Sequence, residues 1–447
     1  MAEKLFGTDG IRGVANRYPV SCEISLKIGR AAGMLARKLD FKSIVIGRDT
    51  RESGEMLEAA LISGILSTGI NALPAGIIPT PGVAYLTAGH GDAGLGIVIS
   101  ASHNPYQDNG IKIFTHQGKK LDRSDQEFIE NFIQSDDNYS GSYNIGRISA
   151  IANANQKYAD FLRSTLDFKL FKQKLNIVID CSNGAAWNTV PLVFDPEYFN
   201  TRIIFNKPDG KNINKNCGSQ FTTTLAEQVV KNRFDIGLGF DGDADRLITV
   251  DENGDEVKGD RILAICAEFY KNRGLLENNM VVSTIMSNIG LGIFLKRLHI
   301  QHEITDVGDA NVMDGMIKSG AVLGGEDSGH LIFLKHHTTG DGILSALRLL
   351  EVMAVEEKPL SKLARTMEVF PQVLMNVKVP RTKPDFMKTK EISDKIQQVR
   401  QILGSKGRVL IRYSGTQPLL RVMVEGPDME TTENCCQQIC AKIEKYL

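Results

Sequence analysis

Three aspartates at alternate positions form the most distinctive pattern in the sequence. Asp241, Asp243 and Asp245 are separated by one glycine and one alanine, and Arg246 follows them. If the segment is extended or looped, the small intervening residues let the three carboxylates converge, and like charges so close together need a cation to offset their repulsion. Ligand sets made only of oxygen favour Mg²⁺ over Zn²⁺. The pattern therefore predicts a magnesium site.

The same acidic segment also fits a different class of enzyme. Asp-x-Asp after an apolar strand is typical of phosphatases whose first aspartate accepts the phosphoryl group, which would make Asp241 a nucleophile. This interpretation predicts phosphate release to water and no stable phosphoserine. Asp245 argues against it, because such enzymes normally have Thr or Val at that position. A further alternative is a protein that binds a sugar phosphate or Ca²⁺ without turnover.

A second polar turn follows the apolar residues 97–99 and reads Ser-Ala-Ser-His-Asn-Pro over residues 100–105. Ligand sites of α/β proteins usually lie at the carboxyl ends of parallel strands. The turn is therefore expected to present the Ser102 hydroxyl at such an end, with His103 beside it. Lys112 is close enough in sequence to supply positive charge. The alternative is a plain strand-to-helix turn with capping hydroxyls.

Three glycine-containing segments carry groups suited to a sugar phosphate, and each could instead be a surface turn. Backbone N–H groups, hydroxyls and guanidinium groups suit a phosphate dianion, and residues 410–421 supply them through Arg412, Ser414, Gly415, Thr416 and Arg421. Glycines flank Glu326 and Ser328 in residues 323–330, where a carboxylate and a hydroxyl suit vicinal sugar hydroxyls. Near the start, Arg12 lies between two glycines and is a candidate anion contact.

Repeated strand–turn–helix patterns must position these groups. Residues 44–49, 177–184 and 281–288 are each an apolar run that ends in a polar turn, which indicates strands of parallel sheets covered on both faces. Asn-Gly within residues 251–256 predicts a hairpin. The last 75 or so residues combine strand-like runs with a final amphipathic helix, which indicates a small α+β domain.

Composition and charge bound the class of protein. The 447 residues include 52 Lys+Arg and 53 Asp+Glu, so no bulk charge attracts the chain to nucleic acid or to a membrane. The start of the chain lacks the apolar region of a secretory signal, and no stretch has about 20 unbroken apolar residues. Seven cysteines without a CxxC pair favour reduced thiols. We therefore expect a cytoplasmic protein without nucleic-acid or membrane partners.

Taken together, these segments resemble the α-D-phosphohexomutase superfamily along the whole chain. Its phosphoserine, magnesium, sugar and phosphate loops resemble, in this order, residues 101–105, 241–246, 325–330 and 412–418. Four motifs in the family's order are specific, whereas any one alone would be weak. Residues 6–16, 324–330 and 338–342 most resemble the bacterial branch that acts on glucosamine phosphates. The sequence departs from that branch at Asp327, Tyr413, Gln417 and residues 309–311.

The resemblance implies an α/β fold of three similar α/β domains with mixed sheets and a smaller C-terminal α+β domain around a central cleft. The implied domains are residues 1–148 with the phosphoserine loop, 149–255 with the magnesium loop, 256–367 with the sugar loop and 368–447 with the phosphate loop. The fourth domain would be able to close over the substrate.

The resemblance also implies an intramolecular phosphotransferase that interconverts glucosamine 6-phosphate and glucosamine 1-phosphate through a phosphoserine enzyme and a bisphosphate intermediate. Its product would feed UDP-N-acetylglucosamine and cell-wall precursors. Phosphomannomutase/phosphoglucomutase activity is the alternative within the superfamily. The implied cofactors are one Mg²⁺ per chain and glucosamine 1,6-bisphosphate or another hexose bisphosphate as primer. The implied partner is a small-molecule hexosamine phosphate; an activating protein kinase or autophosphorylation, and a homodimer, are further expectations.

Residue roles follow from the same resemblance. An oxygen of phosphorylated Ser102 would join the three aspartates in binding Mg²⁺, and the remaining negative charge would be offset by Arg12, Lys112 and Arg246. Glu326 and Ser328 would hold ring hydroxyls. The non-reacting phosphate would contact Arg412, Ser414, Gly415, Thr416 and Arg421. The general base is left open among three candidates, which are Lys112, His103 and His330.

Overall fold

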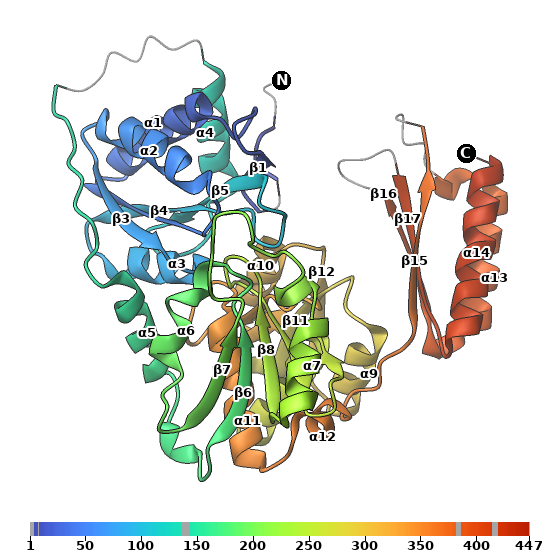
Figure 1. Ribbon diagram of the computed structural model, residues 1–447. Coiled ribbons are helices and arrows are strands. Elements are labelled where there is room, and N and C mark those ends of the chain that lie inside the picture. Colours follow the sequence, from blue (N-terminus) through green and yellow to red (C-terminus); the bar gives the residue numbers. More distant parts are fainter. Residues whose placement is uncertain (1–3, 8, 136–142, 381–385, 414–418, 447) are drawn as a thin grey trace. The chain divides into compact units, whose positions relative to one another are not determined.

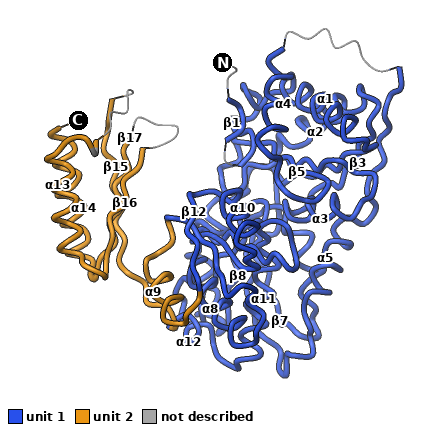
Figure 2. The backbone as a smooth tube through the Cα atoms, turned by 180° about the vertical axis from the view of Figure 1, so that it is seen from behind, with its two compact units in different colours: residues 1–285, 301–365 blue, residues 286–300, 366–447 orange. Residues whose placement is uncertain are grey.

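The computed structural model describes residues 4–7, 9–135, 143–380, 386–413 and 419–446. The chain forms two compact units (Figure 2): residues 1–285 with 301–365, and residues 286–300 with 366–447. Each unit is described by itself. The first contains three sheets and the second contains one.

The first sheet has the order β1-β5-β4-β2-β3. Strands β2, β3 and β4 are parallel, whereas β5 and β1 continue the sheet antiparallel. Helix α3 covers one face and α1, α2 and α4 cover the other (Figure 1). The bounds are β1 Ile11–Val14, α1 Cys22–Lys38, β2 Ser43–Arg48, α2 Gly54–Leu66, β3 Asn71–Ile77, α3 Thr80–Gly89, β4 Ala93–Ile99, β5 Asp108–Thr115 and α4 Arg123–Gln134.

Close helix packing explains two glycines in this domain. A Cβ on Gly29 of α1 would lie 2.2 Å from the Leu61 carbonyl oxygen of α2, and one on Gly64 of α2 would lie 2.2 Å from that of Leu26. Both positions therefore exclude larger residues. Strand β4 is buried along its whole length, so it lies within the domain core and leads directly into the Ser102 turn.

The second sheet has the order β10-β9-β8-β6-β7, and its strand β8 ends immediately before Asp241. Strands β9 and β10 form the predicted hairpin. The bounds are α5 Ala154–Ser164, β6 Leu175–Asp180, α6 Val190–Val193, β7 Phe199–Ile204, α7 Thr223–Asn232, β8 Ile236–Phe240, β9 Leu247–Asp251 and β10 Glu256–Val257.

The third sheet has the order β12-β11-β13-β14, with β14 antiparallel to β13. The loop between β13 and β14 carries the predicted sugar-binding residues. The bounds are α8 Gly259–Asn272, β11 Met280–Thr284, β12 Gln301–Thr305, α10 Asp309–Ser319, β13 Leu323–Gly325, β14 Leu331–Phe333, α11 Gly342–Glu356 and α12 Leu360–Ala364.

The second unit contains an antiparallel sheet in the order β15-β17-β16, covered by two helices. The bounds are α9 Ile289–Arg297, β15 Gln372–Lys378, α13 Lys390–Leu403, β16 Arg408–Tyr413, β17 Leu419–Glu425 and α14 Met429–Tyr446. The fold-class prediction is confirmed: three α/β domains with mixed sheets precede a smaller α+β domain. All seven cysteines are free. Within the described residues, no helix combines the length and apolar character that crossing a membrane requires.

Candidate active site

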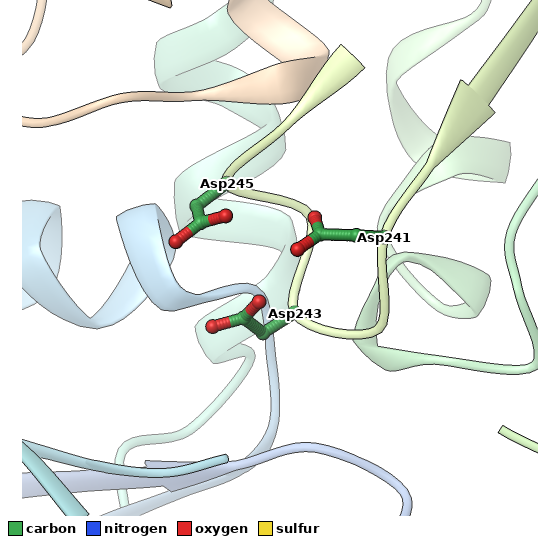
Figure 3. A group of neighbouring side chains, drawn as sticks. All are labelled: Asp241, Asp243 and Asp245. Atoms are coloured by element: carbon green, nitrogen blue, oxygen red, sulfur yellow. The ribbon is translucent and has the colours of Figure 1, made fainter. Parts of the chain in front are cut away.

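The three alternating aspartates converge at the end of β8 (Figure 3). Each offers a carboxylate oxygen, and these atoms all lie within 4.8 Å of one another. In the turn that brings them together, Ala244 has a left-handed φ of 54°, a conformation that strains a residue with a Cβ. Its N–H donates to the Asp241 carbonyl at 3.0 Å. All three aspartates are buried.

Ser102 follows β4 and faces this acidic cluster from the first domain. Its Oγ donates to Asp241 Oδ2 at 2.5 Å and lies 3.1 Å from His103 Nδ1. Ser102 has no exposed surface. Buried polar and charged side chains surround the hydroxyl, so it lies within a buried polar cluster.

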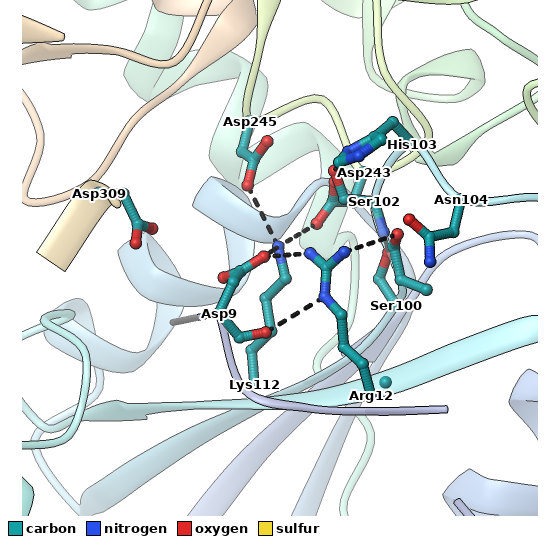
Figure 4. Close-up of polar contacts among 12 residues, drawn as sticks. Asp9, Arg12, Ser100, Ser102, His103, Asn104, Lys112, Asp243, Asp245 and Asp309 are labelled. Atoms are coloured by element: carbon teal, nitrogen blue, oxygen red, sulfur yellow. Dashed lines mark hydrogen bonds and ion pairs between the residues drawn. The ribbon is translucent and has the colours of Figure 1, made fainter. Parts of the chain in front are cut away.

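Lys112 neutralises part of the acidic cluster. Its Nζ lies 2.8 Å from Asp243 Oδ2, 3.1 Å from Asp245 Oδ2 and 3.0 Å from Asp9 Oδ2 (Figure 4). Burial opposes the charge, but the three carboxylates outweigh it and raise the pKa of Lys112 well above its usual value. Lys112 therefore stays protonated, which fits charge neutralisation and argues against it as a general base.

Two arginines approach the cluster from different segments. Arg12 lies on β1, pairs with Asp9 and places Nη1 3.3 Å from the Ala101 carbonyl oxygen, next to the Ser102 turn (Figure 4). Arg246 follows the acidic loop. Its backbone N–H donates to Asp241 Oδ1 at 3.1 Å, and its side-chain Nε lies 3.8 Å from Asp245 Oδ1. Both guanidinium groups thus lie close to where negative charge gathers.

The polar atoms without partners test whether the residues fit a cation. Among the described residues, Asp243 Oδ1 and Asp245 Oδ1 are buried and accept no hydrogen bond. Buried carboxylate oxygens without donors are costly unless a cation binds them. Although burial favours the neutral acid, Lys112 and other nearby groups lower the pKa of Asp245 to about 2, so this carboxylate is ionised. Three convergent carboxylates, two of which have an oxygen that accepts no hydrogen bond, fit Mg²⁺.

His103 is the histidine next to the hydroxyl. Burial, followed by the charges of Arg246 and Arg12, lowers the pKa of His103 to about 4. The imidazole is therefore neutral near pH 7 and has a lone pair available.

The third domain contributes a mixed set of residues. Glu326 Oε1 accepts the Gly308 N–H at 3.0 Å, and Ser328 is exposed. His330 is buried, with Nε2 3.7 Å from Asp309 Oδ2. Asp309 also pairs with Lys120 of the first domain, so the loop that carries Glu326 is linked to the Ser102 domain.

The predicted phosphate loop is only partly described. Arg412 on β16 and Arg421 on β17 are directly paired residues of adjacent antiparallel strands. The structure thus places these two residues opposite each other on adjacent strands. Ser414, Gly415 and Thr416 lie outside the described residues.

Several charged and polar residues of the cluster were not among the sequence predictions. Asp9 contacts both Arg12 and Lys112, Thr80 donates to Asp243, and Lys120 contacts both Asp9 and Asp309. Asp9 lies in the glycine-containing segment that indicated Arg12, so that segment carried a signal. Nothing in the local sequence of Thr80 or Lys120 distinguishes them from surface residues.

Comparison with protein-family models gives four matches. Phosphoglucomutase/phosphomannomutase alpha/beta/alpha domain I matches residues 3–140, domain II residues 156–254, domain III residues 258–370 and the C-terminal domain residues 374–442. The matches follow the family's order and account for most of the chain.

Curated relatives and solved structures agree with these matches. Phosphoglucosamine mutase of Desulforapulum autotrophicum is 55% identical, and that of Syntrophus aciditrophicus is 49% identical; in both cases the alignment covers 99% of each chain. A phosphoglucomutase/phosphomannomutase family protein of Burkholderia thailandensis has the same fold (TM-score 0.81, 21% identity, covering 100% of this chain and 98% of that one). N-acetylphosphoglucosamine mutase of Aspergillus fumigatus, solved with GlcNAc-6P and magnesium, is more distant (TM-score 0.68, 16% identity, covering 99% and 95%).

Proposed function

Because this chain belongs to the phosphoglucomutase/phosphomannomutase family, we propose that Ser102 exchanges a phosphoryl group with a hexose phosphate in its active site. The chain is a phosphohexomutase, an isomerase, and its reaction is that of a phosphoglucosamine mutase. The observation that carries the proposed role of Ser102 is its hydroxyl, which lies 2.5 Å from a carboxylate of the convergent acidic trio.

The proposed reaction has two half-reactions. In the first, a hydroxyl oxygen of the sugar monophosphate attacks the phosphorus of phosphorylated Ser102, the P–Oγ bond breaks, the proton of the sugar hydroxyl is passed to the departing Oγ, and a sugar bisphosphate forms. In the second, Ser102 Oγ attacks the other phosphate of the bisphosphate, the bond between that phosphorus and the sugar oxygen breaks, and the sugar oxygen gains a proton as the isomeric monophosphate leaves. The serine proton must leave Oγ in this step, and neutral His103, 3.1 Å away, is the candidate acceptor.

Charge neutralisation is the main demand of phosphoryl transfer. Asp241, Asp243 and Asp245 would hold Mg²⁺, which offsets the negative charge of the phosphoryl group when it is bound. Magnesium is present in the related structure from Aspergillus fumigatus. Lys112 orients two of the carboxylates, and Arg12 and Arg246 supply further positive charge at the Ser102 turn.

Substrate recognition is proposed to use two sets of groups. Glu326 would accept hydrogen bonds from ring hydroxyls, and the exposed Ser328 would donate hydrogen bonds to them. Arg412 and Arg421, which lie opposite each other on adjacent strands, would hold the non-reacting phosphate, together with Ser414, Gly415 and Thr416. A bisphosphate that reacts at either end must fit both subsites in both orientations, which favours recognition through charges and hydroxyls.

The burial of Ser102 adds a requirement to this proposal. A phosphoryl group cannot reach Oγ unless side chains of the polar cluster move aside. The cluster is held by ion pairs, and a dianionic phosphate can replace the carboxylates as partner of Lys112 and Arg12. We therefore expect the cluster to rearrange when Ser102 is phosphorylated.

The finer expectations on cofactors and partners remain proposals. They are one Mg²⁺ per chain, a hexose bisphosphate primer, a hexosamine phosphate substrate and a cytoplasmic location. Protein-kinase activation or autophosphorylation and a homodimer also stay predictions.

Turnover of three substrates tests the proposed function. The purified protein is supplied with Mg²⁺ and a trace of hexose bisphosphate, and its kcat/KM is compared for the 1-phosphates of glucosamine, glucose and mannose. We expect the highest value for glucosamine 1-phosphate. Preference for mannose or glucose 1-phosphate would instead favour phosphomannomutase/phosphoglucomutase activity, and inorganic phosphate as the main product would favour a phosphatase.

A further inference from the structure

Arg51 contacts the turn that carries Ser102 and lies outside the motifs that the sequence indicated. The geometry points to Arg51 as a positioning residue that holds the backbone of residues 102–108 and thereby fixes the reacting hydroxyl. This inference rests on the proposed role of Ser102. The inference starts from the burial of Arg51. Its side chain has no exposed surface and is among the largest fully buried side chains of the described residues.

All five N–H donors of the Arg51 guanidinium are used. Nε donates to Asp49 Oδ2 at 2.9 Å. Nη2 donates to the carbonyl oxygens of Ser102 at 2.9 Å and Asn104 at 2.8 Å, and Nη1 donates to those of Pro105 and Asp108. A guanidinium has five donors in a fixed plane. One side chain therefore ties four carbonyl groups of a single loop together.

Both backbone hydrogen-bonding groups of Ser102, its N–H and its carbonyl, have side-chain partners. The Ser102 N–H donates to Ser100 Oγ at 2.9 Å, and Ser100 Oγ donates to Asp49 Oδ2 at 2.7 Å. The Ser102 carbonyl also accepts from Asn214 Nδ2 of the second domain at 2.8 Å. Arg51, Ser100 and Asn214 thus fix both hydrogen-bonding groups of the residue.

This restraint matters because Ser102 has a left-handed φ of 52°. A residue with a Cβ is strained there and adopts that conformation only when its surroundings impose it. Without the Arg51 contacts, the turn would relax toward ordinary backbone angles and the hydroxyl would turn away from Asp241. Phosphoryl transfer depends steeply on the placement of the reacting atoms.

Arg51→Lys is the test, because lysine keeps a positive charge beside Asp49 but lacks the planar fork. We expect kcat to fall about 100-fold while KM for the sugar phosphate stays within about threefold. Arg348→Lys is the matched control, since Arg348 is buried, pairs with Glu351 at 2.9 Å and lies on α11 away from the turn. It should retain the wild-type kcat.

Amide hydrogen exchange measures positioning without turnover. In Arg51→Lys, peptides that cover residues 100–108 should exchange about tenfold faster than in wild type, and peptides from β6 and α11 should be unchanged. This comparison decides the inference even if the wild-type protein shows no mutase activity. Unchanged exchange over residues 100–108, or equal acceleration across all domains, would overturn it.

Chemical rescue distinguishes the loss of the planar guanidinium donors from misfolding of the chain. In Arg51→Ala, added guanidinium should restore turnover at least tenfold, because it can replace the planar donors, whereas ammonium at equal concentration should not. Asn214→Ala removes one donor to the same carbonyl and should lower kcat less than Arg51→Lys. No rescue together with wild-type kcat in Asn214→Ala would contradict the positioning role.

Discussion

Charge balance around Ser102 determines what individual residues contribute. The cluster joins five carboxyl groups, of Asp9, Asp241, Asp243, Asp245 and Asp309, with four basic groups, of Arg12, Lys112, Lys120 and Arg246. One formal negative charge is left when all of these groups are ionised, and a phosphoryl group adds about two more. A divalent cation is therefore most needed when Ser102 is phosphorylated.

Removal of one carboxylate should weaken cation binding without damaging the fold. In Asp243→Asn, the lost charge should reduce Mg²⁺ affinity at least about tenfold. Titration of Mg²⁺ by calorimetry measures this effect. The midpoint of thermal unfolding should not fall in the absence of Mg²⁺, because like-charge repulsion is relieved.

The matched control is Asp209→Asn, which removes an exposed carboxylate from a loop of the same domain. It should bind Mg²⁺ as the wild type does. Wild-type affinity in Asp243→Asn would show that the acidic trio is not the cation site.

At the residue scale, sequence motifs could predict several groups that lie together in the polar cluster but not how they contact one another. The acidic trio and the Ser102 turn each stand out because several chemical groups gather within a few residues. Arg51, Thr80 and Lys120 could not be recognised, because their roles depend on contacts with distant segments. The Thr80–Asp243 hydrogen bond, for example, spans 163 residues.

At the element scale, helix α4 holds the N-terminal segment that carries Asp9 and Arg12. Glu130 of α4 is buried and accepts the N–H groups of Leu5 and Phe6, both at 2.8 Å. Glu130→Ala would leave two N–H groups without acceptors, at a cost of about 1–3 kcal/mol. We expect a lower free energy of unfolding, measured in urea, and a lower kcat as Arg12 loses its position.

Glu127→Ala on the same helix is the control, since its ion pair with Arg123 is exposed. Such a pair contributes at most about 1 kcal/mol, so stability and kcat should be close to wild type. If the two variants behave alike, α4 does not position the N-terminal segment.

The N-terminus of α11 should make stability depend on pH. Asp341 caps this helix by accepting the Leu344 N–H at 2.9 Å, and it also accepts the Tyr158 hydroxyl at 2.7 Å. Burial outweighs both hydrogen bonds and raises the pKa of Asp341 to about 7. The folded state thus retains a proton that the unfolded state loses at lower pH. Stability from this group is fully present below the unfolded pKa and is lost as pH rises to about 7.

Asp341→Asn should remove this dependence, because the amide keeps an acceptor and does not titrate. The free energy of unfolding of wild type minus that of the variant should fall by roughly 1–4 kcal/mol between about pH 4 and pH 8. Urea unfolding at several pH values measures the difference. A constant difference would mean that Asp341 is already ionised at low pH in the folded protein.

Strand–turn–helix units could be predicted because apolar runs and glycine turns are local signals. Residues 44–49, 177–184 and 281–288 correspond to β2, β6 and β11 with their following turns. Strand order could not be predicted, because β4 pairs with β2 and β5 pairs with β1, and the partners in both pairings are far apart in sequence. The burial of Ser102 follows from those pairings and from the packing of the second domain on the turn.

At the scale of the whole molecule, the two compact units should unfold in separate transitions. The single tryptophan, Trp187, lies in the first unit, and neighbouring Ala185 donates to the Gly242 carbonyl in the acidic loop at 2.8 Å. Tryptophan fluorescence therefore reports on the first unit, whereas circular dichroism reports on both. Mg²⁺ should raise the fluorescence midpoint and leave a second transition, seen only by circular dichroism, unchanged.

Coincident transitions by both probes, shifted together by Mg²⁺, would contradict independent units. Asp243→Asn provides the control, because its fluorescence midpoint should not respond to Mg²⁺.

The overall organisation could be predicted from four motifs in one order, since each motif marks one domain. Domain boundaries at residues 148, 255 and 367 stay predictions.

The most direct test of the account is the phosphorylation state of Ser102. Wild-type protein is incubated with Mg²⁺ and a hexose bisphosphate, and its peptides are mapped by mass spectrometry. One phosphoryl group should be found on Ser102, and Ser102→Ala should lack it, fold normally and lose turnover at least about a thousandfold. A phosphoryl group on Asp241 instead of Ser102, or unchanged turnover in Ser102→Ala, would contradict the central claim.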